Sequence, residues 1–200
     1  TISMKKYIGV ALIIVLCAFT LTMKLKKIKA GDVSMQVPDA FEEVDEQTRR
    51  GEYSGKNAPI AVYRSPRDKS AITIYHTADS VRAKTIKYQK QKGAILKFDR
   101  DLEMEYAFKK SSFSGKFKEL NFIQDGIANV NGKDFIFFEF DGVIEATDRM
   151  GRQSLTKVYN YMLYTYVKED IYSINFICKG DLKEDYQKTI QEVMKTVKIK

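Results

Sequence analysis

The sequence has very few of the side chains that most catalytic and metal sites use. Its 200 residues include one histidine, His76, and two cysteines, Cys17 and Cys178. A zinc site built from several His or Cys ligands is therefore excluded, and a Ser-His or Cys-His nucleophile would have to use His76. No partner is evident for His76, so we interpret it as an ordinary strand-end histidine. We expect a protein that is not an enzyme and has no metal or cofactor.

Phosphate-binding glycine loops are also missing, because neither GxGxxG nor GxxxxGK[ST] occurs. The net charge of +8 first suggests nucleic acid or anionic lipid. However, residues 1–30 carry six lysines and no acid, which leaves 28 basic and 26 acidic side chains in residues 31–200. This balance of +2 argues against a basic groove, so we expect no nucleic-acid partner.

A charge-free run covers residues 7–23, YIGVALIIVLCAFTLTM. As a helix it would span about 25 Å, near the lower limit for crossing a bilayer. The start Met4-Lys5-Lys6 is also typical of a secretory signal, but no good small-x-small cleavage site follows. We therefore favour an uncleaved transmembrane anchor over a removed signal helix. Cys17 follows Leu16 rather than a small residue, so a lipoprotein site is not indicated.

The basic flanks of this run are interpreted as membrane anchors in the headgroup region. They consist of Lys5, Lys6, Lys24, Lys26, Lys27 and Lys29. The richer C-terminal flank places the following domain in the cytoplasm by the positive-inside rule, whereas the short Met-Lys-Lys start favours export. We expect an extracytoplasmic domain at the periplasm or cell surface, with the cytoplasmic side left open.

The remaining residues, 31–200, predict one globular domain of alternating strands and helices, since 44% of the chain is hydrophobic. Residues 33–37 predict a short strand ended by Pro38, and residues 58–63 and 71–77 predict a hairpin. Residues 41–56 predict irregular structure or a weak strand. Helices are expected from about residue 79 to 93 and from about residue 99 or 101 to Gly115.

The pair Asn131-Gly132 lies between two apolar runs and predicts a type I′ hairpin. The strand that follows, KDFIFFEF, is apolar on both faces, which favours a central strand covered on both sides. Residues 158–167 and 171–178 predict two more strands. A closing helix is expected because apolar residues recur at spacings of 4, 4, 3 and 4: Leu182, Tyr186, Ile190, Val193 and Val197. These elements predict an α+β fold with an antiparallel sheet flanked by helices.

Three segments carry a resemblance to a known superfamily: SMQVPDAF at residues 34–41, the Asn131-Gly132 hairpin, and DIYSI at residues 170–174 before the final helix. On these segments residues 31–200 resemble the PsbP-like fold superfamily of α-β-α sandwich domains, which includes DcrB-type bacterial lipoproteins and related accessory domains. The resemblance implies a binding or accessory role. It assigns no site residue, because these motifs mark the fold.

Two groups of side chains are candidate sites. An acidic patch could bind Ca²⁺ or hold paired carboxylates, although we favour a solvated strand face as its explanation: Glu139, Asp141, Glu145 and Asp148. A tyrosine cluster could form an interaction surface, although strands favour aromatic residues in any case: Tyr159, Tyr161, Tyr164, Tyr166 and Tyr172.

These features favour a membrane-tethered interaction domain, an accessory or assembly subunit whose protein partner belongs to a membrane or envelope complex. The alternative is a small-ligand-binding domain with an apolar cavity. A carboxylate-dependent enzyme is the third and least favoured interpretation.

Overall fold

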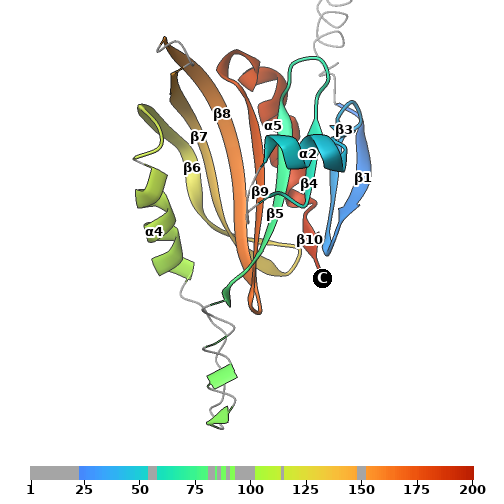
Figure 1. Cartoon of the computed structure of the whole chain (residues 1–200), viewed down its shortest axis with the longest axis vertical. Coiled ribbons are helices and arrows are strands. Elements are labelled where there is room, and N and C mark those ends of the chain that lie inside the picture. Colours follow the sequence, from blue (N-terminus) through green and yellow to red (C-terminus); the bar gives the residue numbers. More distant parts are fainter. Residues whose placement is uncertain are drawn as a thin grey trace, which may run out of the picture.

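The structure is a computed structural model. It describes residues 23–53, 58–80, 84, 87–88, 91–92, 102–113, 115–147 and 152–200. The described strands form two antiparallel sheets (Figure 1). The larger has the order β3 (Glu42–Glu43), β4 (Ala61–Arg64), β5 (Ala71–Ala78), β9 (Asp170–Lys179), β8 (Gln153–Val167), β7 (Lys133–Thr147) and β6 (Glu119–Val130). The smaller has the order β1 (Leu25–Ala30), β2 (Val33–Pro38) and β10 (Lys198–Ile199).

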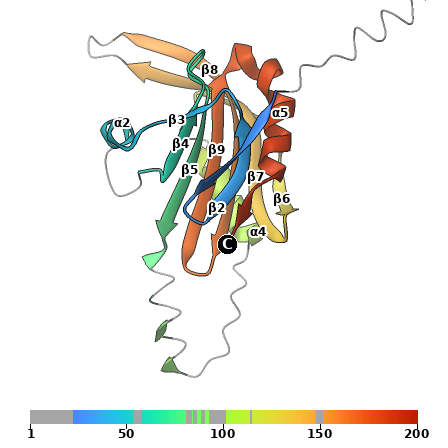
Figure 2. The same ribbon diagram turned by 90° about the vertical axis from the view of Figure 1, so that its right-hand side faces the viewer.

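Helices lie against both faces of the larger sheet. The described helices are α2 (Glu46–Glu52), α4 (Leu102–Phe113), the 3-10 turn η1 (Gly180–Leu182) and α5 (Lys183–Lys195). In Figure 2, α5 runs alongside the smaller sheet on one face of the larger sheet. One apolar cluster joins α5 and the smaller sheet to that face, and a second joins α4 to the opposite face. The predicted α+β class with an antiparallel sheet is therefore confirmed.

Turn chemistry explains the predicted hairpins. Asn131 and Gly132 both have positive φ angles, 51° and 83°, as a type I′ turn requires, and they join β6 to β7. The hairpin predicted from residues 58–63 and 71–77 is also confirmed, because residues 61–64 of β4 pair antiparallel with residues 71–74 of β5.

Strand β7 has apolar side chains on both faces of the larger sheet, so both faces must be covered by other elements. Phe135 belongs to the cluster under α5, whereas Ile136, Phe138 and Phe140 belong to the cluster under α4. All four side chains are at most 1% exposed. The two-sided apolar pattern read from KDFIFFEF thus corresponds to burial on both faces.

Several elements differ from the expectations. The first described strand, β1, lies before the predicted boundary at residue 31 and pairs with β2 along its whole length. The opening strand β2 belongs to a separate sheet completed by β10, which was not predicted. Helix α2 occupies the segment predicted as irregular, and Asp45 caps it by accepting from the backbone N–H of Thr48.

Two predicted elements lie outside the described residues, wholly or in large part. These are the apolar run at residues 7–23 and the helix at residues 79–93. Within the ranges that the structure describes, every helix is too short or too polar to cross a bilayer.

The packing of α5 gives a first prediction. Ile190 is 0% exposed at the centre of the helix, so Ile190→Ala should lower the free energy of unfolding by about 2–5 kcal/mol through lost burial and a cavity. Urea unfolding followed by circular dichroism measures this change. The control Lys188→Ala, at an exposed position of the same helix, should change stability by less than about 0.5 kcal/mol.

Candidate functional site

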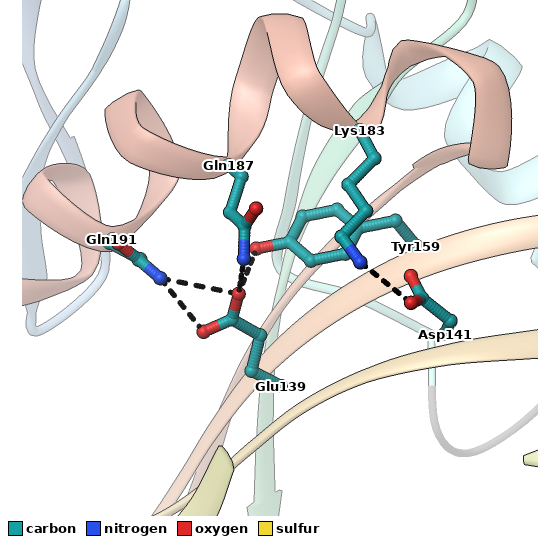
Figure 3. Close-up of polar contacts among 6 residues, drawn as sticks. All are labelled: Glu139, Asp141, Tyr159, Lys183, Gln187 and Gln191. Carbon is teal, nitrogen blue, oxygen red and sulfur yellow. Dashed lines mark hydrogen bonds and ion pairs between the residues drawn. The ribbon is translucent and has the colours of Figure 1, made fainter. Parts of the chain in front are cut away.

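One face of α5 carries a row of polar side chains that turns toward β7. Lys183, Gln187, Gln191 and Lys195 recur every four residues, so they lie along one side of the helix. This side lies next to the apolar stripe that seats the helix on the sheet. Figure 3 shows Lys183, Gln187 and Gln191 reaching down to β7 and β8.

Glu139 on β7 receives most of these contacts. Its side chain is 0% exposed, and its carboxylate accepts hydrogen bonds from Gln187 Nε2 at 2.6 Å and from Gln191 Nε2 at 3.0 Å (Figure 3). Tyr159 on β8 donates its hydroxyl at 3.0 Å, and Gln124 on β6 donates from its amide. Four neutral donors from three elements therefore surround one buried carboxylate.

The balance of burial and hydrogen bonding sets the charge of Glu139. Burial alone raises the pKa of a carboxyl group, but the hydrogen bonds donated by Gln124, Gln191, Gln187 and Tyr159 outweigh it and hold the pKa of Glu139 below 4.5. Burial and the adjacent Glu139 charge raise the pKa of the Tyr159 phenol, which remains a donor. Glu139 is thus an anion at neutral pH.

Beside this cluster, a first hollow of about 530 Å³ lies at the start of α5. We call it the Lys183 hollow. Lys183 Nζ contacts Asp141 Oδ2 at 2.6 Å, and both side chains line the hollow (Figure 3). The other lining residues come from β6, β7, β8 and η1: Glu119, Leu120, Asn121, Gly142, Val143, Lys157, Val158 and Gly180.

A second hollow of about 470 Å³ lies at the other end of the cluster, and we call it the Phe137 hollow. Its apolar lining includes Phe137, Tyr161 and Met194, with the Phe137 and Tyr161 rings stacked at 6.4 Å. Gln124, Asn129, Gln191 and Lys195 add polar groups to the lining. We use the name α5 groove for the two hollows together with the Glu139 cluster between them.

The acidic patch predicted from the sequence does not form one site. Glu139 is buried and bonded to neutral donors, Asp141 pairs with Lys183, and Glu145 is exposed. Asp148 lies outside the described residues. Over the described part of the chain, no group of three or more His, Cys, Asp or Glu side chains could hold a metal ion.

The tyrosine cluster is likewise divided between the two faces of the sheet. Tyr159 and Tyr172 are 0% and 2% exposed in the core under α5, and Tyr161 lines the Phe137 hollow, where burial raises its pKa to about 12. Tyr164 and Tyr166 pack on the opposite face against α4. The strand alternation separates them, so the five rings share no common surface.

The lysine flank is partly a strand. Lys26, Lys27 and Lys29 belong to β1 and Lys24 precedes it, whereas Lys5 and Lys6 lie outside the described residues.

His76 and Cys178 line neither hollow, and Cys178 on β9 is the strand partner of Tyr159 on β8. His76 Nε2 lies 3.2 Å from Asp170 Oδ1, and its ring stacks on Tyr172 at 4.7 Å. Burial raises the pKa of the Cys178 thiol to about 12, which keeps it protonated.

Four residues of the site were not predicted from the sequence: Gln124, Gln187, Gln191 and Lys183. A signal for three of them was present, because a polar row at spacing four borders the apolar stripe of the closing helix. Gln124 had no such signal, since its place opposite Glu139 depends on a register shift in β6 after Phe122.

Comparison with known proteins identifies the fold. No family model matches the chain, and no curated protein matches it. Cyanobacterial PsbP (CyanoP) from Synechocystis sp. PCC 6803 has a similar structure, with a TM-score of 0.54 and 11% identity over 92% of this chain and 96% of that one. The Saccharomyces cerevisiae Ran-binding protein Mog1p gives a TM-score of 0.50 and 12% identity over 88% and 96%. The PsbP-like fold predicted from sequence is confirmed.

The Glu139 cluster predicts a strong effect of a nearly isosteric change. In Glu139→Gln, the new amide group can accept at only one atom, so some of the four donors lose their acceptor at about 1–3 kcal/mol each. We expect a clear fall in the free energy of unfolding at neutral pH, measured by urea titration. Glu145→Gln at an exposed position of β7 is the matched control and should be nearly neutral. Equal stability of both variants would contradict the cluster.

The lowered pKa of Glu139 also predicts an acid dependence. Its hydrogen bonds stabilise the fold fully above the unfolded value near 4.5, and this contribution is lost as the pH falls through the lower folded pKa. The stability of the natural protein should therefore fall below about pH 4.5 more steeply than that of Glu139→Gln, so the two curves converge in acid. Unfolding curves at a series of pH values test this, and parallel curves would contradict it.

Proposed function

We propose that the protein is a non-enzymatic, membrane-tethered interaction domain that binds a protein partner in the α5 groove. The observation that carries this proposal is the groove itself, with two hollows of about 530 and 470 Å³ on either side of a fixed polar cluster. Partner surfaces of this kind combine apolar contact area with a few oriented hydrogen-bonding groups.

The chemistry of the groove supports binding over reaction. Glu139 accepts hydrogen bonds from four donors, so it is committed to holding α5 on the sheet. Lys183 and Asp141 neutralise each other at 2.6 Å, which leaves a paired polar contact and no free base. Phe137, Tyr161 and Met194 supply the apolar area in which a partner side chain would be buried.

The fold is compatible with this role. Mog1p, which has a similar structure, is described as a Ran-binding protein. For this chain we propose an accessory or assembly subunit of a membrane or envelope complex.

The tether is proposed from the sequence. Residues 7–23 contain no charged side chain and are flanked by lysines, and the first described strand begins two residues after this run. We propose that they anchor the domain, on the extracytoplasmic side, where the short Met-Lys-Lys start would direct it.

A second candidate function is supported by the Phe137 hollow. A small flat apolar molecule could stack on Phe137 and Tyr161 and bond to the amides of Gln124 and Gln191. Such a ligand would be retained in native mass spectrometry of the purified chain, whereas a protein partner would appear only as a complex.

Filling the Phe137 hollow tests the proposal. Ala128 lines it from β6, so Ala128→Arg places a long cation where a partner side chain would sit. Full-length chain is captured from detergent-solubilised native membranes, and co-purifying proteins are quantified. We expect a partner that is recovered with the natural chain to fall at least about tenfold with Ala128→Arg, the loss of one buried contact.

The matched control is Ala146→Arg, the same change at an exposed position of β7 outside both hollows. It should leave recovery unchanged, and circular dichroism should show both variants folded. Equal recovery with both variants would place the partner surface elsewhere.

A further inference from the structure

The outer face of the smaller sheet carries lysines from its first strand, β1, and from the C-terminal strand β10. In β1 the side chains of Lys27 and Lys29 are exposed, while Ile28 and Ala30 turn inward to the core. Lys29 pairs with Ser34 of β2, and Ser34 pairs in turn with Lys198 of β10. Lys29 and Lys198 therefore stand on the same face, two strand spacings or about 10 Å apart.

We define the basic face as the outward side chains of Lys27, Lys29 and Lys198, with Ser34 and Gln36 between them. Strands β1, β2 and β10 contain no acidic residue. The nearest acid in the β1–β2 turn, Asp32, accepts a hydrogen bond from Tyr172. None of the three lysines makes an ion pair with a residue that the structure describes, so the charge of the face is not balanced locally.

The opposite side of these strands is apolar and fixed. Val33, Met35 and Val37 of β2 are at most 3% exposed in the core under α5. This burial holds the backbone of the sheet, so the lysines project from a rigid support and not from a mobile tail. The buried side chains of β2 therefore fix the positions from which the lysine side chains project.

We propose that the basic face binds the headgroups of anionic phospholipids, so that the domain sits with the smaller sheet against the membrane surface. This inference rests on the proposed membrane tether and names the surface that meets the lipid. Two observations favour a lipid surface as the occupant. Every charged side chain of the face is a lysine, which complements an anionic headgroup layer, and β1 begins two residues after the charge-free run that ends at Met23.

Lysine labelling of the full chain in lipid nanodiscs tests the proposal. Discs of phosphatidylcholine are compared with discs that also contain phosphatidylglycerol, and the rate of amine labelling is measured at each lysine by mass spectrometry. Lys27, Lys29 and Lys198 should label several-fold more slowly in the anionic discs at low salt, and the difference should vanish at high salt. The exposed Lys118, Lys168 and Lys188 should label equally in both.

A variant with matched charge provides the second measurement. The first triple variant removes the lysines of the basic face by Lys27→Gln, Lys29→Gln and Lys198→Gln. The second has the same net charge but removes exposed lysines elsewhere, by Lys118→Gln, Lys168→Gln and Lys188→Gln. The low-salt ratio of full-chain binding to phosphatidylglycerol vesicles over binding to phosphatidylcholine vesicles, in which the contribution of the anchor cancels, should fall about fivefold per removed lysine in the first variant only.

The outcomes separate the tether from the basic face. A chain that is washed off phosphatidylcholine vesicles by alkali has no anchor, which overturns the tether, while the comparison of the two triple variants still tests the face. Equal losses in both triple variants would indicate general charge attraction and overturn the proposal. Equal protection of the three lysines in neutral discs would indicate shielding that does not depend on headgroup charge, and would also overturn it.

Discussion

Glu139 places a negative charge where water does not reach, and the surrounding elements are arranged to keep it there. Transfer of an ionised carboxylate into a protein interior costs several kcal/mol unless hydrogen bonds replace its hydration. Here the replacement comes from β6, β8 and α5 through Gln124, Tyr159, Gln187 and Gln191. Any shift of α5 along or across the sheet would separate donors from the acceptor. The carboxylate therefore fixes the position of the helix, and with it the shape of the hollows on both sides.

The α5 groove exists because helix α5 is narrower than the sheet on which it packs. A helix with side chains is about 10 Å across and covers about two strands spaced about 4.8 Å apart, whereas the larger sheet has seven strands in the described part of the chain. The stripe of Tyr186, Ile190 and Val193 seats α5 in the core shared with β8, β9 and β2. The same face of β6 and β7 thus extends beyond the helix. The polar row of α5 and Met194 reach this face, and space remains at both ends of the Glu139 cluster.

Part of the fold could be predicted from the chemistry of local sequence segments. Asn131-Gly132 specifies its own turn, and the two-sided apolar pattern of β7 requires two covering layers, so the hairpin, the layering and the closing helix could be inferred. The smaller sheet could not, because β2 joins residues near the start of the domain to Lys198 and Ile199 at its other end, and β10 has only two residues. The candidate site could not be predicted from the sequence for a related reason. Glu139 looked like an exposed strand acid by its alternation, and nothing local revealed that Gln187 and Gln191 would come to lie above it.

Helix α5 separates the two surfaces to which we assign functions. Its polar row borders the α5 groove, while its other side contacts β2 of the smaller sheet. The C-terminal end of α5 is tied to both neighbours: Thr196 Oγ1 accepts from the backbone N–H of Gln36, and Asn131 Nδ2 donates to the carbonyls of Lys195 and Val197. A membrane against the basic face would therefore leave the groove open beside the bilayer. Because the same rigid helix supports both surfaces, seating on lipid would present the groove to a membrane partner in one orientation, which lowers the entropy that the partner must lose on binding.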